Sequence, residues 1–184
     1  METNEIIDSN FNEYKNDGNP INLISSRRFI LFYILSFGLY GFWWMYKMWS
    51  FFKQKESLYI WPVARAIFGI FFIYRLFEKI MSFARSNGKE SDYSSESLAG
   101  CFIIFYFFSR LPNPYWMISL FAFLFCIQPI NVFNEAILIS KTYDGTIDAK
   151  YNGIQLGFLI FGIIYWILML LALFTLGLLS YLFP

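Results

Sequence analysis

The sequence predicts an all-helical membrane protein, a single bundle of about five membrane-crossing helices, with four or six as alternatives. The first reason is composition, because 58% of the 184 residues are hydrophobic, 23% are aromatic and only 15% are charged. Soluble domains carry about 25% charged residues, so the aromatic excess requires an apolar solvent. The second reason is the alternation of long uncharged runs with short polar segments, which is typical of polytopic helical proteins.

The chain divides into a tail at residues 1–26 and a single transmembrane helical domain at residues 27–184. The tail is acidic, with Lys15 as its single base, and residues 17–20 (DGNP) are a turn signal. We expect this tail to be flexible and cytoplasmic. Because a cleavable signal peptide begins with basic residues, we expect the tail to be retained and the first apolar helix to act as an uncleaved anchor.

The first apolar run, residues 29–46, is the first candidate span. It follows Arg28 and contains no charge, and a helix of about 20 apolar residues crosses the hydrocarbon layer. Alternatively, Gly38 and Gly41 break this helix into a re-entrant hairpin. That hairpin would return Lys47 and the lysines that follow it to the cytoplasmic side.

The second apolar run, residues 58–77, contains Arg65 and Arg75. Pro62 suits a helix start, because a residue in the first turn needs no amide donor. Both arginines can extend toward the headgroups while their stems lie on apolar surface. We expect a short, tilted or partly interfacial helix, followed by a polar, serine-rich linker in water at residues 86–97.

The rest of the chain predicts a helical hairpin and a last span. The sequence RLPNP at residues 110–114 contains two prolines, which an ordinary helix cannot accommodate. We therefore expect helical arms at residues 98–109 and 115–133, and a tilted span within the uncharged residues 154–184. A cytoplasmic N-terminus puts more Lys and Arg on the inner segments than on the outer ones, which favours that orientation for a multi-pass protein.

An aromatic cluster follows the first glycines. Trp and Tyr concentrate at the membrane–water boundary, because the ring is apolar and one edge is polar. We interpret the cluster as such an interface belt; the alternative is a cage for a cationic ligand. Gly38 and Gly41 lie on adjacent turns and would let another helix approach closely. The predicted belt consists of Tyr40, Trp43, Trp44, Tyr46 and Trp49.

Arg65 and Arg75 are candidate functional residues, because an ionisable side chain in a span is costly. One interpretation is that they extend to the interface from both ends of a short helix, with Glu78 pairing to Arg75. The other is that Arg65 lies in the bundle and binds an anionic lipid headgroup or pairs with Glu135. Loss of binding or folding in Arg65→Leu would favour the second.

A polar face is predicted near the end of the hairpin's second arm. Gln128, Asn131 and Glu135 have i, i+3 and i+7 spacing on a helix, with Asn134 beside them and Pro129 interrupting the backbone hydrogen bonds. In a bilayer such side chains face the protein interior or a wet cavity. They would form hydrogen bonds between helices or line a path for a solute or ion.

Residue types needed for catalysis are scarce. His is absent, so no Ser-His or Cys-His pair exists. No phosphate-binding glycine loop and no metal-ligand spacing occurs. Cys101 and Cys126 lie alone in apolar runs, and a net charge of +1 gives no case for nucleic acid. We expect no enzymatic activity, no cofactor and no metal site.

Three stretches resemble a family of small, uncharacterised bacterial inner-membrane proteins whose opening reads roughly L-S-x-x-T-F-G-x-Y-x-x-Y-W-x-Y-K-x-W. They are FYILSFGLYGFWWMYKMW (32–49), WPVARAIFGIFFIYRLF (61–77) and LPNPYWMISLFAFL (111–124). The chain departs from the pattern where Phe32-Tyr33 replace Leu-Ser, Ser36 replaces Thr and Trp43 replaces the second Tyr. The resemblance implies a bacterial inner-membrane location and no activity, cofactor or site residue.

Together these observations predict a non-enzymatic integral membrane protein. It would act as a partner or accessory subunit that binds lipids or other membrane proteins, including a second copy, with an immunity or regulatory protein as a subclass. The alternative is a small transporter or channel that uses the polar face at residues 128–135. A third hypothesis is membrane shaping by re-entrant hairpins.

Overall fold

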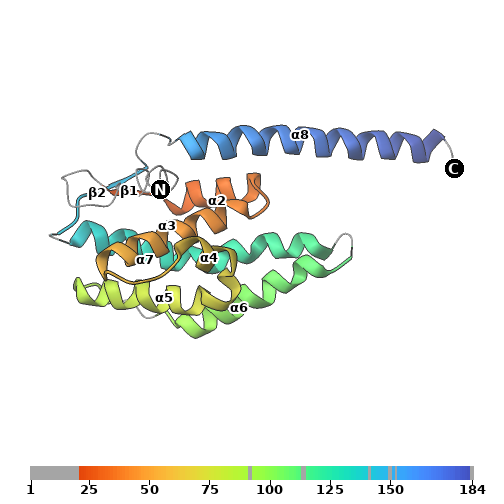
Figure 1. Cartoon of the computed structure of the whole chain (residues 1–184). Coiled ribbons are helices and arrows are strands. Elements are labelled where there is room, and N and C mark those ends of the chain that lie inside the picture. The colour runs from red at the N-terminus through yellow and green to blue at the C-terminus, as the bar shows by residue number, and fades with distance from the viewer. Residues whose placement is uncertain are drawn as a thin grey trace, which may run out of the picture.

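The structure is a computed structural model that describes residues 21–90, 93–112, 115–140, 142–148, 151 and 153–182. It is mostly helical, which confirms the all-α class (Figure 1). Residues 1–20 of the predicted tail lie outside the described residues. The elements are β1 (Ile21–Leu23), α2 (Ser26–Leu35), α3 (Leu39–Lys55), α4 (Pro62–Ile67), α5 (Gly69–Ser86), α6 (Ser95–Phe107), the 3-10 turns η2 (Phe108–Arg110) and η3 (Tyr115–Phe123), α7 (Leu124–Ile139), β2 (Gly145–Ile147) and α8 (Gly153–Leu182).

The first apolar run is a helical hairpin, not one straight helix. The chain turns between α2 and α3, where Phe37 and Gly38 have φ angles of 51° and 87°. Such left-handed backbone favours glycine. Ser36, the C-cap of α2, also fixes the first turn of α3, because its Oγ accepts a hydrogen bond from the backbone N–H of Tyr40 at 2.9 Å. The expectation of a continuous helix over residues 29–46 is therefore wrong, and the glycine break that the alternative required is present at Gly38.

The second apolar run is also broken. Pro62 begins α4, as predicted, and the chain bends at Phe68 before α5 starts. A Cβ built on Gly69 would lie 2.8 Å from the Sδ and Cε of Met45, so the missing side chain lets α5 start directly against α3. Along α5, buried and exposed residues alternate with helical periodicity, so α5 is amphipathic.

The predicted linker at residues 86–97 is shorter than expected. Ser86 is the last residue of α5, and Ser95 is the first of α6. Tyr93 lies between them and is buried, and its hydroxyl donates to the backbone oxygen of Phe77 at 2.7 Å. Residues 91–92 lie outside the described residues. This connection therefore packs on the bundle, because one aromatic side chain anchors it.

The hairpin predicted at RLPNP is confirmed. The helix formed by α6 and η2 ends at Arg110, and the chain returns through η3 and α7. Residues 113–114 lie outside the described part. Pro129 lies inside α7 and is buried. The two arms lie side by side, beneath α2 in Figure 1.

A short parallel strand pair joins two segments that are distant in sequence. Ile21 of β1 pairs with Gly145 of β2, and Leu23 pairs with Ile147. A Cβ at Gly145 would lie 2.6 Å from the Cγ2 of Ile137, so glycine lets β2 lie against α7. The Asp-Gly signal at residues 144–145 predicts a turn, and the strand that follows it was not expected.

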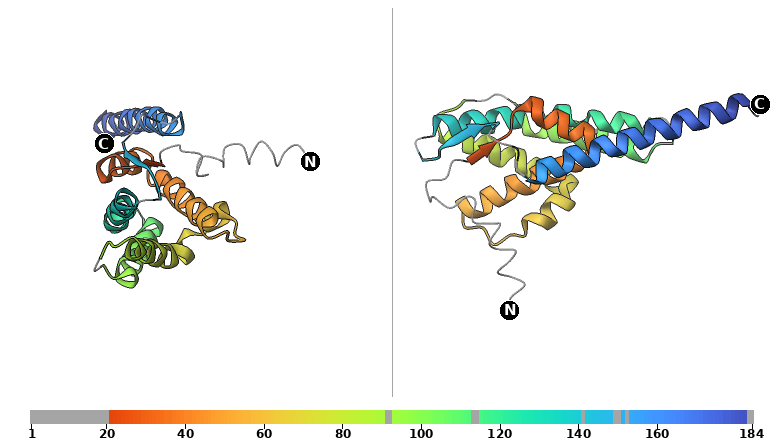
Figure 2. Two further views of the ribbon diagram at one scale, coloured as in Figure 1. Left: turned by 90° about the vertical axis from the view of Figure 1, so that its left-hand side faces the viewer. Right: turned by 90° about the horizontal axis from the view of Figure 1, so that it is seen from above.

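Aromatic side chains dominate the core of the bundle. Those of Phe29, Phe32, Trp49, Phe52 and Phe77 are fully buried. They come from α2, α3 and α5 and bring these helices into one packed unit, which Figure 2 shows end-on. Each such ring buries about 150–250 Å² on folding, so aromatic packing is the main apolar contribution to this unit.

Helix α8 lies along α2 and extends far beyond the rest of the bundle (Figures 1 and 2). It approaches most closely at Gly162, where a Cβ would lie 2.7 Å from the backbone oxygen of Leu35. Two segments are long and apolar enough to cross a membrane, Tyr115–Ile139 and Gly153–Ala172. Only 6% of the second is buried, against 39% of the first. These segments support a membrane location.

Candidate functional site

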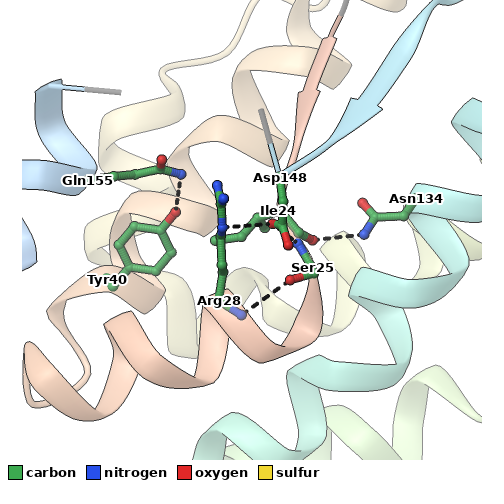
Figure 3. A network of polar contacts seen from close by, with 7 residues as sticks. All are labelled: Ile24, Ser25, Arg28, Tyr40, Asn134, Asp148 and Gln155. Carbon is green, nitrogen blue, oxygen red and sulfur yellow. Dashed lines mark hydrogen bonds and ion pairs between the residues drawn. The ribbon is translucent and has the colours of Figure 1, made fainter. Parts of the chain in front are cut away.

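A polar network joins the residues that follow β1 and β2 to the helices α2 and α7 (Figure 3). Asp148, directly after β2, accepts from the backbone N–H of Ser25 at 2.9 Å and pairs with Arg28 at 3.4 Å. Ser25 is also the N-cap of α2, and its Oγ accepts from the Arg28 N–H at 3.3 Å. From α7, Asn134 donates to the backbone oxygen of Ile24 at 2.8 Å. These contacts fix the start of α2 against α7 and β2.

The same end of the bundle holds the start of α8. Gln155 donates from Nε2 to the hydroxyl of Tyr40 at 3.2 Å (Figure 3). The guanidinium of Arg28 lies 4.4 Å from the ring centroid of Tyr151, a cation–π distance. The network thus contains short-range structural contacts and no arrangement of a nucleophile with a base.

The predicted polar face at residues 128–135 lies on the outside of α7. Gln128, Asn131 and Glu135 are all exposed. Asn131 accepts a hydrogen bond from the Ser26 hydroxyl, and Glu135 pairs with Lys89. The expected interhelical hydrogen bonding is therefore found at Asn131. Of the two surroundings expected for these side chains, the protein interior and a wet cavity, the interior is not the one found.

An open groove of about 420 Å³ runs beside this face. Ser25, Arg27, Asn131 and Asp148 are among the residues that line it. It lies at the polar end of the bundle, between the start of α2, α7 and the end of β2. The placement does not favour a solute path through the protein.

Arg65 does not pair with Glu135, which pairs with Lys89 instead, so the predicted ion pair between Arg65 and Glu135 is wrong. Its guanidinium lies 4.4 Å from the ring centroid of Trp49 and 5.2 Å from that of Phe72. Among the described residues no ion pair joins Arg75 to Glu78, which is also contrary to expectation. Arg75 is exposed and lies close enough for its charge to repel that of Arg65.

The predicted interface belt divides into two groups. Tyr40, Trp44 and Trp49 are buried, with 3%, 4% and 0% of their surface exposed, so these three belong to the protein core and not to a belt. Trp43 and Tyr46 are partly exposed and pack together with ring centroids 5.1 Å apart. Side chains point in all directions around a helix, so some aromatic residues of α3 face the core and others face the surface. The residue types alone do not show which ones are buried.

Exposed interfacial aromatics are found elsewhere. Tyr59 and Trp61, in the segment between α3 and α4, have 104% and 79% of their reference surface exposed. The sequence signal for them was present, because both lie in a short stretch between apolar helices next to charged residues.

Gly38 and Gly41 serve close packing, and their neighbour is the hairpin's own first helix. A Cβ on Gly41 would lie 2.8 Å from Cε2 of Tyr33, and one on Gly38 would lie 3.3 Å from its hydroxyl. Next to this contact is an apolar cavity of about 110 Å³. Its lining includes Tyr33, Gly41, Met45, Ile67, Phe102 and Ser119. No pattern in the sequence predicted this cavity.

Burial changes the proton affinity of groups in the connecting segments. It raises the pKa of Tyr93 and of Tyr143 above the usual value, because an ionised phenolate loses hydration there. It lowers the pKa of Lys55, at the end of α3, whose ammonium lies 4.1 Å from the ring centroid of Phe83.

No group of three or more acidic or Cys side chains that could hold a metal ion is found in the described part of the chain. Comparison with protein-family models, with curated proteins and with solved structures finds no match. The functional interpretation therefore depends on the geometry of this chain.

Proposed function

We propose that the chain is a non-enzymatic integral membrane protein, a partner or accessory subunit that binds lipids and other membrane proteins in a bacterial inner membrane. The observation that carries the proposal is α8. Its 30 residues extend about 45 Å, and the side chains that the structure describes in it are apolar and exposed on almost every side. Such a surface is stable only in hydrocarbon or against another membrane helix.

The bundle supplies a frame for placing the bilayer. Glu56 pairs with Lys79, Lys89 with Glu135, and Arg28 with Asp148. The first pair joins the end of α3 to α5, the second joins the residues after α5 to α7, and the third joins the start of α2 to the residue after β2. All three lie toward the end of the bundle where α8 begins (Figure 1). This polar end is assigned to the cytoplasmic surface.

The α2–α3 hairpin then enters the bilayer from that surface without crossing it. Its turn residue Phe37 stacks on Trp166 of α8, with ring centroids 4.9 Å apart. Trp166 is 13 residues after Gly153, about 20 Å along a helix. The hydrocarbon layer is about 30 Å thick, so the turn lies within it. The η3–α7 arm and α8, the two segments long enough to cross, are assigned as crossing segments. The shorter α6–η2 arm pairs with the η3–α7 arm and is assigned as a third, so the total is fewer than the five expected.

This topology also explains the distribution of basic residues. Lys53, Lys55, Lys79, Arg85 and Lys89 lie at or near the cytoplasmic end of α3 and α5. By contrast, Arg110 lies at the turn between η2 and η3, at the opposite end. Basic residues concentrate in cytoplasmic segments of membrane proteins, and the re-entrant hairpin removes the conflict that the lysines after residue 46 otherwise create.

Labelling of single cysteines tests this placement. Cysteines are introduced at Ser26, Lys55 and Arg110 in a chain whose Cys101 and Cys126 are replaced by alanine. Membrane-impermeant thiol reagents should reach the first two from the cytoplasmic side and the third from the other side. Labelling of positions 26 and 55 from opposite sides would refute the hairpin, and release of the protein by alkaline carbonate would refute integral insertion.

The partner role has its own test. After mild-detergent extraction from the original host, native mass spectrometry should find a stoichiometric protein or lipid bound to the chain. Flux of solutes in reconstituted vesicles, lost in Glu135→Gln, would instead establish the transporter alternative.

A further inference from the structure

The surface formed by α4 and the first turns of α5 carries two positive charges without a counter-charge. Among the described residues, no carboxylate forms an ion pair with Arg65 or Arg75. Below Arg65, the indole Nε1–H of Trp49 is buried and has no acceptor in the described part of the chain. A buried donor without a partner is destabilising, because it has lost its hydrogen bonds to water and gained none in return. This group of donors therefore lacks an anionic or oxygen-rich acceptor.

The apolar cavity lies deeper along the same face of α3. Gly41, Met45 and Trp49 follow one another at i, i+4 and i+8, which places them on one side of the helix. Gly41 and Met45 line the cavity, and Trp49 packs under Arg65. From α4, Ile67 lines the cavity two residues after Arg65.

The order of these features along α3 matches the order of groups in a phospholipid. Trp49 is four residues before Lys53, near the polar end of the hairpin, and Gly41 is about 12 Å further toward the turn. The charged surface is thus close to the headgroup level, and the cavity lies in the hydrocarbon level. The cavity, about 110 Å³, is close in size to one of about 150 Å³ that holds a benzene ring, so it fits a segment of an acyl chain.

We propose that the groove formed by this charged surface and the adjoining apolar cavity is a binding site for an anionic phospholipid. The phosphate lies at Arg65 and Arg75, and one acyl chain enters the cavity between Met45 and Ile67. The inference rests on the proposed function, since it requires the membrane placement given above. A free phosphate ion would satisfy the two arginines and leave the apolar cavity without a role.

The test is native mass spectrometry of the full chain from nanodiscs that contain equal amounts of phosphatidylglycerol and phosphatidylcholine. Wild type should retain phosphatidylglycerol preferentially. Arg65→Gln and Arg75→Gln should each weaken its retention about fivefold, the effect of one basic residue near a charged headgroup. Arg85→Gln is the matched control, because Arg85 is exposed on the same helix as Arg75 and lies beyond the groove.

A second variant tests the cavity. Ser119 lines it, and its hydroxyl donates locally to the backbone oxygen of Trp116. Ser119→Leu should fill the space with apolar atoms and reduce retention of phosphatidylglycerol without changing the preference over phosphatidylcholine. Circular dichroism and retention in the membrane fraction show whether each variant is folded and inserted.

Three results would overturn the lipid site. One is equal loss in Arg65→Gln and Arg85→Gln. Another is displacement of the bound lipid by inorganic phosphate together with no effect of Ser119→Leu, which would indicate a simple anion site. The third is no retained lipid from a protein that carbonate does not extract, in which case this inference fails and the membrane assignment stands.

Discussion

The bundle of α2 to α7 and the helix α8 have similar residue types and opposite surroundings. In the bundle, Phe52 and Phe77 are fully buried, and the ring of Phe52 packs against those of Phe51 and Phe83. In α8, Phe174 is 67% exposed. The difference is one of pattern: α5 is apolar on one face, whereas α8 is apolar on all faces. The apolar face of a helix such as α5 is covered by other helices, whereas a helix that is apolar all round must be covered on every side by lipid or by other apolar protein surface.

The comparison is tested most strongly by removing one large ring from each region. Phe52→Ala should lower the free energy of unfolding by about 3–5 kcal/mol, because it leaves a cavity in a packed core. Phe174→Ala should change it by less than about 0.5 kcal/mol. Unfolding titrations with a denaturing detergent measure both. Equal losses would mean that α8 is packed against protein along its whole length.

A charge placed on α8 tests the comparison from the other direction, because here the large effect is expected in α8 and not in the bundle. Leu168 is 59% exposed and lies near the middle of α8. Leu168→Arg should oppose insertion by about 2.5–3.5 kcal/mol, because a charged side chain is costly at the centre of a span. A glycosylation-reporter assay of insertion measures this cost. Arg replacing Leu111, which is 41% exposed at the hairpin turn, is the control and should insert normally. Normal insertion of Leu168→Arg would contradict the bilayer placement of α8.

The smallest effect separates two glycines. Gly41→Ala should destabilise the bundle by about 1–3 kcal/mol, because the new methyl group would lie 2.8 Å from the Tyr33 ring. Gly157→Ala meets no atom within 4 Å and replaces glycine inside a helix, so it should stabilise α8 by about 0.5–1 kcal/mol. The same unfolding titrations should give opposite signs. A neutral Gly41→Ala would mean that α2 and α3 are not in close contact.

Local signals in the sequence identified several elements correctly. The prolines of RLPNP predicted the turn between α6 and α7, and Pro62 predicted the start of α4, because proline restricts its own backbone wherever it occurs. The glycine at position 38 predicted the break in the first apolar run, but only as the second of two alternatives. There, the absence of charge over residues 29–46 favoured one long helix, and the left-handed turn at Phe37 and Gly38 overrode it.

The candidate site was much harder to predict. Three of the five belt residues lie in the core, and the face at residues 128–135 is exposed, because a residue's type does not determine which neighbour covers it. Asp148 pairs with Arg28 across 120 residues of sequence. A contact between residues so far apart produces no periodic pattern in either segment, so it cannot be predicted from the local sequence.

The sequence by itself determined the helical class, the apolar character of α8, the scarcity of catalytic residue types and the positions where proline ends a helix. These properties depend on composition and on backbone restrictions that act within a few residues. Only the tertiary structure decided that the first run is a hairpin and that β1 pairs with β2. It also decided that Arg65 lies on Trp49 one helical turn from an apolar cavity. Each of these depends on which distant segments share a boundary, and that is set by the packing of the whole chain.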